Sequence, residues 1–327
     1  MTRQWLRLLH RFTGTLPVYP ATDYLSEKPL PAMLFVLASI LSSIIILVLF
    51  RLIDRSAAVT RRTIVVSYLV SAITGVVFFP IQWQDFPLYW AAYAVFGGVA
   101  LYVGFSLIGL TTQRNGIAVA GVATKISVVI PIGIGILFLG ESVNWLKLLG
   151  IFAGLSAVVL VAVKPATKQA AIKPDNAVVG ASSMVSWNLP VLVFVFSGLT
   201  DASFKLLQVA GLTTVLFLPF LVLAFGFAFV TSLIHHLVGS ERSMNRQSLF
   251  YGVFLGVTNF GTVYFIMKAL AIPNWESSLI YPLNHFGVVL GSVLVGVLLF
   301  GESLPRRVQL GLVMAIISIV FLALAST

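Results

Sequence analysis

Long runs of apolar residues, separated by short polar breaks, dominate the chain from residue 31 onward. A helix needs about 20 apolar residues to cross the hydrocarbon core of a bilayer, because each residue advances it by about 1.5 Å. Ten runs meet this requirement: 31–51, 63–81, 87–110, 116–139, 145–164, 189–210, 212–236, 247–270, 276–300 and 306–325. The pattern predicts an all-α integral membrane protein with ten transmembrane helices.

The ends of the fourth and ninth runs carry the same short motif. Gly140-Glu141-Ser142 closes one run and Gly301-Glu302-Ser303 closes the other, and a glycine follows in the next run, at Gly150 or Gly311. The two copies lie 161 residues apart. Self-similarity at a fixed offset indicates that the chain contains two copies of one structural unit.

A polar segment divides the apolar runs into two sets of five. We expect a first repeat over 31–164, a polar linker over 165–188 and a second repeat over 189–327. Because five is odd, the second repeat begins on the opposite side of the membrane. The halves are then related by a two-fold axis in the membrane plane, as in many secondary transporters.

Residues 1–30 stand apart from the repeats. Arg3, Arg7 and Arg11 fall four apart, which is the spacing of a basic amphipathic helix on a membrane surface. The alternative is a disordered arm, because Gly14 and three prolines follow. No apolar stretch with a cleavage site follows the basic start, so we expect no signal peptide.

Composition narrows the function classes. Only 9% of the 327 residues are charged, against about 25% in soluble domains. The net charge of +10 then indicates basic loops beside anionic lipid headgroups rather than nucleic-acid binding. The chain has no cysteine, and its four histidines are too scattered for a zinc site. We expect no metal, no cofactor and no enzymatic activity, since no nucleophile–base set or phosphate-binding loop appears.

The orientation in the membrane has two conflicting indications. Lys and Arg outside the runs are more numerous on the face opposite the termini. The positive-inside rule would therefore place the termini outside the cell. A basic arm that binds anionic cytoplasmic lipid would place them inside, so both orientations stay open.

The paired motifs resemble those of the drug/metabolite transporter superfamily, in particular its ten-helix EamA-type permeases. The resemblance covers residues 31–325 and rests on Leu139-Gly140-Glu141 with Gly150 and Gly154, and on Phe300-Gly301-Glu302 with Gly311. It implies two inverted five-helix repeats, a substrate cavity between them and cytoplasmic termini in a cell (inner or plasma) membrane. One feature departs from the four-helix exporters of that superfamily, which carry a glutamate in their first helix. The first run here offers Ser39, Ser42 and Ser43 and no acid.

Ionisable groups inside a span are costly, so each is a candidate functional residue. Lys125 lies deep in the fourth run, without an acid three or four positions away, and Pro131 follows within two turns. We expect Lys125 to contact an anionic group of a substrate beside a kink at Pro131. The alternative is a structural pair with an acid on another helix.

Asp201 and Lys205 lie four apart in the sixth run, the favourable spacing for an ion pair within one helix. Asp201 is the acid furthest inside a span, so it is the candidate site for coupling to a proton or sodium ion. The alternative is that the two side chains only neutralise each other's charge and have no role in transport. Glu141 and Glu302 sit at the ends of runs, and we expect them to anchor or cap helices there.

The ninth run supplies the remaining main candidates. Tyr281, Asn284 and His285 share one helical face, and Pro282 loosens the turn between them. The offset of 161 residues between the repeats matches His285 with Thr124, the residue before Lys125. The symmetry then predicts that His285 and Lys125 lie at similar depths on two helices that face each other. Helix–helix hydrogen bonding is the alternative role. In the eighth run, Asn259 and Tyr264 are further candidates for substrate binding.

The sequence thus predicts a permease or exporter that moves a small polar metabolite, such as an amino-acid-like or anionic compound, by alternating access. Its partners would be the lipid bilayer, the small-molecule substrate and a coupling proton or sodium ion. Two other classes stay open. One is a membrane-embedded binding or scaffold protein, and the other is an exporter of apolar drugs.

Overall fold

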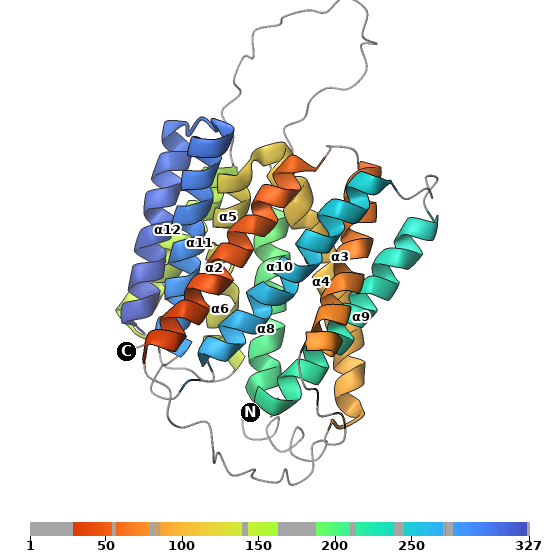
Figure 1. The fold of residues 1–327 in the computed structure, drawn as a ribbon. Coiled ribbons are helices and arrows are strands. Elements are labelled where there is room, and N and C mark those ends of the chain that lie inside the picture. The colour runs from red at the N-terminus through yellow and green to blue at the C-terminus, as the bar shows by residue number, and fades with distance from the viewer. Residues whose placement is uncertain are drawn as a thin grey trace, which may run out of the picture.

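The computed structural model describes residues 29–53, 57–78, 81, 83, 86–138, 143–162, 188–209, 214–238, 245–270, 272 and 277–325. In this part of the chain every regular element is an α-helix: α2 (Pro29–Leu52), α3 (Ala57–Phe78), α4 (Tyr89–Asn115), α5 (Ile117–Ile126), α6 (Val129–Phe138), α7 (Trp145–Ala162), α8 (Asn188–Val209), α9 (Thr214–Val238), α10 (Arg246–Leu270), α11 (Ser277–Phe300) and α12 (Arg306–Leu324). Figure 1 shows them packed as a bundle in which successive spans alternate in direction, with α5 and α6 together forming one span. The predicted arm over 1–30 and linker over 165–188 lie almost wholly outside the described residues.

The described helices have the lengths and composition of membrane spans. Eight segments are long and apolar enough to cross a bilayer, with α5 and α6 counted together. Two further apolar helices are shorter, over Trp145–Leu160 and Asn188–Ser203. Large apolar side chains such as Phe152 and Leu298 are exposed on the outside of the bundle. Exposure to water would cost such side chains about 25 cal/mol per Å² of apolar area, a cost that lipid removes. The chain is therefore a multi-pass membrane protein.

The fourth predicted span is interrupted, which corrects the expectation of one continuous helix over 116–139. Helix α5 ends at Ile126, and α6 begins at Val129 after a turn. Pro131 has no N–H to donate to the carbonyl of Ser127, four residues before it. The N–H of Ile130 bonds that carbonyl instead, at 2.9 Å, in the tighter three-residue pattern. The break lies where the sequence placed a proline kink, in the middle of the span.

Close helix packing depends on glycine at two crossings. A Cβ atom at Gly98 of α4 would lie 2.7 Å from the carbonyl oxygen of Ala224 in α9. A Cβ at Gly256 of α10 would lie 2.5 Å from the carbonyl oxygen of Ser67 in α3. In both cases the obstacle is backbone, which cannot rotate away. These glycines let the helices approach more closely than larger residues would permit.

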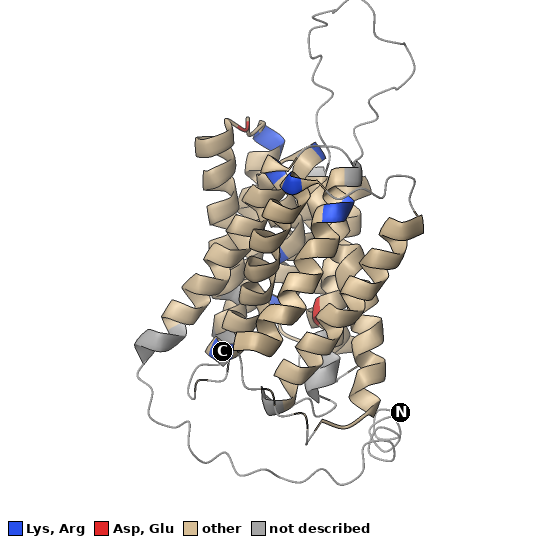
Figure 2. Ribbon diagram, turned by 45° about the vertical axis from the view of Figure 1, so that its right-hand side comes forward, with Lys and Arg blue, Asp and Glu red and all other residues tan. Residues whose placement is uncertain are grey.

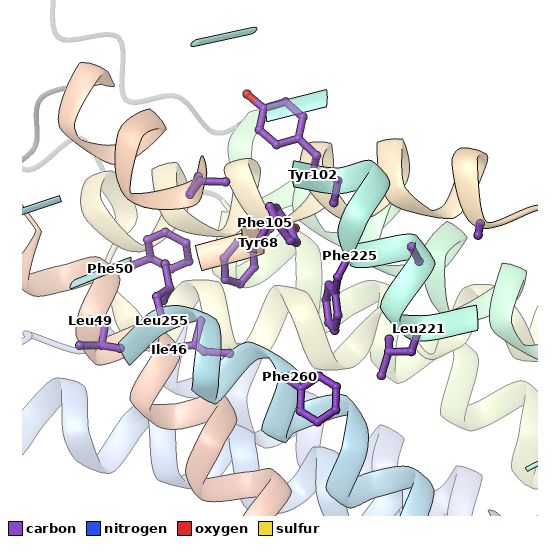
Figure 3. Close-up of a cluster of buried hydrophobic side chains, with 14 of the residues drawn as sticks. Ile46, Leu49, Phe50, Tyr68, Tyr102, Phe105, Leu221, Phe225, Leu255 and Phe260 are labelled. Atoms are coloured by element: carbon purple, nitrogen blue, oxygen red, sulfur yellow. The ribbon is translucent and has the colours of Figure 1, made fainter. Parts of the chain in front are cut away.

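An aromatic cluster joins five helices on one side of the bundle (Figure 3). Phe50 of α2 and Phe105 of α4 meet edge to face, with ring centroids 4.9 Å apart. Tyr68 of α3 lies 5.5 Å from Phe105, and Phe225 of α9 lies 6.2 Å from Phe260 of α10. Such pairs add about 0.5–1.5 kcal/mol each beyond the area they bury. The cluster provides a rigid wall, against which a cavity lies.

Charge is unevenly distributed along the bundle axis. Figure 2 shows Lys and Arg mainly at the end of the bundle away from the C-terminus. We call this end the arginine-rich face, and it includes the helix-end residues Arg51, Arg61, Arg114, Arg246 and Arg306. The other end, where α12 finishes, is the C-terminal face. This distribution agrees with the excess of basic residues that the sequence placed opposite the termini.

Candidate functional site

A cavity of about 800 Å³ lies inside the bundle. Every described helix except α9 contributes to its lining. The volume falls within the usual range of about 300–1,000 Å³ for small-molecule sites. The cavity is therefore large enough for a metabolite-sized ligand and lies between the N-terminal and C-terminal halves of the chain.

The cavity reaches one face of the bundle and stops short of the other. On the C-terminal side its lining includes Lys147, Tyr281 and Leu322, each within about one turn of the end of its helix. On the arginine-rich side the lining ends at Leu47 and Ile108. These residues lie five and seven positions before the ends of α2 and α4, which corresponds to about 7–10 Å of helix. Among the described residues, the lining thus approaches the C-terminal face and stops short of the arginine-rich face.

Lys125 and Asp201 form the charged centre of the cavity. Lys125 is in the last turn of α5, where the negative end of the helix dipole favours a cation. Its charge and that of Asp201 on α8 interact. The hydroxyl of Ser127, in the turn between α5 and α6, donates to the carbonyl of Thr124 at 2.6 Å and lies 3.5 Å from Asp201 Oδ2. Asp201 lies deep in the bundle but is accessible from the cavity. The helix break therefore brings Ser127 beside the Asp201 carboxylate, within the electrostatic influence of Lys125.

His285 completes this centre from the other half of the chain. Helices α5 and α11 pack against each other, and Lys125 and His285 both line the cavity. The ring of Tyr281 meets it edge to face at 6.3 Å. The cavity therefore contains Lys125 from the first half of the chain and His285 from the second.

Three buried polar groups of the cavity lining have no hydrogen-bond partner among the described residues. They are Ser43 Oγ on α2, Asn259 Nδ2 on α10 and His285 Nδ1 on α11. Each of these residues is at least nine-tenths buried. An unsatisfied buried polar group costs about 1–3 kcal/mol, so such groups are retained where a ligand or water can bond them. The three residues line the cavity, but these atoms are themselves covered, so a polar ligand would reach them after a rotation of the side chains.

Asn284 has a structural hydrogen bond as well as a place in the lining. Its Nδ2 donates to Ser39 Oγ at 3.0 Å, and Ser39 Oγ donates to the carbonyl of Thr262 at 2.9 Å. This chain links α11, α2 and α10. The helix–helix alternative considered for the ninth run therefore applies to Asn284.

The site residues that the sequence analysis predicted fall into three groups. Lys125, Asp201, Asn259, Tyr281, Asn284 and His285 all line the cavity. Tyr264 is not among the lining residues, and its ring stacks on Phe260 with centroids 5.6 Å apart. The side chain of Lys205 and all of Glu141 lie outside the described residues. The predicted pair of Asp201 with Lys205 therefore stays a prediction, and among the described residues the charge of Lys125 on α5 acts on Asp201.

Several cavity residues escaped the sequence analysis. Thr124, Ser197 and Thr200 line the cavity, and Lys147 adds a second cation near the C-terminal face. Short hydroxyl residues are common in membrane helices and carry little signal individually. A usable signal was present in the four-residue spacing of Ser39 with Ser43 and of Ser197 with Asp201, which places each pair on one helical face.

Comparison with known proteins identifies a fold but no family. No family model matches the chain, and no curated protein matches it. One solved crystal structure, described only as that of a protein, is similar, with a TM-score of 0.51 and 13% sequence identity. The match covers 90% of this chain and 97% of the other. At this identity the likeness concerns the fold alone. Among the described residues no three His, Cys, Asp or Glu side chains gather as a metal site.

Proposed function

We propose that the protein is a secondary transporter of the drug/metabolite transporter type, which moves a small polar metabolite through the cavity by alternating access in a cell membrane. The observation that carries the proposal is the cavity itself. It is metabolite-sized, lies between the halves, contains Lys125 and Asp201, and is closed toward one face. A scaffold protein would not need such a cavity, and an exporter of apolar drugs would have no use for its charges.

Ten spans in two inverted repeats are part of this proposal. Helices α2, α3, α4, α5–α6 and α7 would correspond to α8, α9, α10, α11 and α12. Corresponding helices run in opposite directions in the bundle. The packing follows this correspondence. Helix α2 packs on α10, and their counterparts α8 and α4 also pack on each other. In the same way α3 packs on α10, and their counterparts α9 and α4 pack on each other. Helices α3, α5 and α7 each pack on their own counterparts, α9, α11 and α12. These pairings are those expected of a two-fold axis.

The chemistry of the lining favours a substrate with an anionic group and further hydrogen-bonding atoms. Lys125 would hold the negative charge, because an ammonium in a low-dielectric site binds a carboxylate or phosphate strongly. Asn259 Nδ2 would donate to a second oxygen atom of the substrate. Asp201 would bind either an ammonium group of a zwitterion or a coupling proton or sodium ion.

Transport by purified protein in proteoliposomes tests the proposal. A substrate is first identified by comparing metabolites in cells with and without the protein. We expect Lys125→Ala to reduce its transport by about tenfold to a hundredfold, the range for lost hydrogen bonds to a charged group. Lys268→Met is the matched control, because Lys268 lies outside the cavity lining with its ammonium over the Tyr264 ring. Equal rates for Lys125→Ala and the wild type would refute the assignment.

A further inference from the structure

Glu302 bonds a helix that belongs to the other half of the chain. It follows α11, in the connection to α12, and its carboxylate accepts hydrogen bonds from the first two residues of α5. Oε1 lies 2.9 Å from the N–H nitrogen of Ile117, and Oε2 lies 3.3 Å from that of Ala118. The expectation that Glu302 caps a helix end is met, but at α5 rather than at its own helix.

The local backbone is built around this carboxylate. The first N–H groups of a helix have no partner within it, and the helix dipole favours an anion there. Gly116 precedes α5 with φ of 103°, and a Cβ atom on it would lie 2.8 Å from Glu302 Oε1. A Cβ on Gly296 would lie 2.6 Å from Oε2. The N–H of Glu302 also donates to the carbonyl of Gly296 at 2.9 Å. Two glycines thus make room for the carboxylate.

Arg51 extends the contact to two more helices. Its Nε lies 3.9 Å from Glu302 Oε1, and its Nη1 donates to the carbonyl of Gln113 at 3.2 Å. Gln113 in turn donates to Thr60 Oγ1 at 2.9 Å. The side chains of Arg51 and Glu302 are only 20% and 11% exposed, so water screens the pair less than it would at an open surface. The α11–α12 connection is thereby joined to α2, α3, α4 and α5.

The contacts among Glu302, Arg51 and the first turn of α5 lie at the end of the cavity that stops short of the arginine-rich face. Ile117 lies one turn beyond Gly121, where the lining of α5 ends, and Arg51 lies one turn beyond Leu47, where that of α2 ends. We propose that Glu302, Arg51 and the first turn of α5 form a latch that closes the cavity toward the arginine-rich face. Release of Glu302 from α5 is the step that opens this face. The proposal rests on the proposed transport function, because a latch has a purpose only if the cavity opens to both faces.

Accessibility of a single cysteine tests the latch without a substrate. The chain has no cysteine, so Ile108→Cys places a unique thiol at the closed end of the cavity lining. A membrane-impermeant maleimide is applied to intact cells and to inverted membrane vesicles, which present opposite faces. We expect labelling of Ile108→Cys from the C-terminal face and slow labelling from the arginine-rich face. Adding Glu302→Gln should speed labelling from the arginine-rich face by roughly tenfold, the effect of losing a charge-assisted hydrogen bond.

Two companion variants separate the latch from general effects. Gly296→Ala leaves Glu302 intact but displaces its carboxylate, so it should speed the same labelling and decides the matter if Glu302→Gln fails to fold. Arg306→Gln removes an exposed charge at the same face, outside the latch, and should leave labelling unchanged. Unchanged labelling in both folded latch variants would overturn the latch even if Lys125-dependent transport is found. Faster labelling without any transport would instead keep the latch and remove the proposed function.

Discussion

His285 and Lys125 line the same cavity on two helices that pack against each other, although 160 residues separate them in the chain. His285 lies on α11, and Lys125 lies in the last turn of α5, beside the break in the fourth span. A single substrate in the cavity would therefore contact groups from both halves at once. Movement of one half against the other would change that set of contacts, as alternating access requires.

The first prediction concerns the unpartnered donors. Ser43→Ala and Asn259→Leu should each raise the KM for transport by about twofold to tenfold, because each removes a hydrogen bond of about 0.5–1.5 kcal/mol to the substrate. Thr258→Ala is the matched control for Asn259→Leu. Thr258 is the preceding residue, is half-buried, does not line the cavity and donates to carbonyls of its own helix. Concentration-dependent uptake into proteoliposomes gives the KM values, and a KM unchanged in both variants would contradict this role.

The second prediction concerns helix packing and uses two adjacent glycines. Gly98→Ala should lower the free energy of unfolding by about 1–3 kcal/mol, because its Cβ would meet the backbone of α9. Gly97→Ala should have no such penalty, since its nearest neighbour is Phe220 Cζ at 3.7 Å, an ordinary contact. Thermal unfolding in detergent compares the two variants directly. Equal midpoints would show that α4 and α9 do not pack as described.

Much of the architecture could be predicted from the sequence, because membrane spans leave a strong local signal. The lengths of the apolar runs predicted where the helices lie. The repeated glycine-glutamate motif supplied the 161-residue offset that matches His285 with the region of Lys125. The latch from Glu302 to Ile117 could not be predicted in this way. It depends on which helix end lies nearest in space, and that is set by packing across the whole bundle. The placement of Ser127 beside Asp201 could not be predicted either, because a four-residue spacing within one helix is visible in sequence and a contact between helices is not.

The third prediction distinguishes a transporter from a membrane-embedded scaffold. Single cysteines at Val128 and Ile132, which line the cavity, should react with an aqueous maleimide applied from the C-terminal face. Cysteines at Leu294 and Leu298 should not, because these side chains are exposed on the lipid-facing outside of α11 and do not line the cavity. A water-filled cavity predicts this contrast between the two pairs of positions. Uniformly inert positions would favour the scaffold.

The fourth prediction concerns ion coupling at Asp201. The neutral amide in Asp201→Asn keeps the shape of the side chain but cannot take up a proton or balance a sodium ion. If Asp201 is the coupling site, this variant should lose accumulation of substrate against a gradient while retaining exchange of labelled for unlabelled substrate. Ser127→Ala, which removes the 3.5 Å contact with Oδ2 together with the 2.6 Å hydrogen bond to the Thr124 carbonyl, should reduce accumulation less severely. Proteoliposomes with imposed proton or sodium gradients measure both activities. Loss of exchange together with accumulation would assign Asp201 to substrate binding instead, and full accumulation by Asp201→Asn would exclude it from coupling.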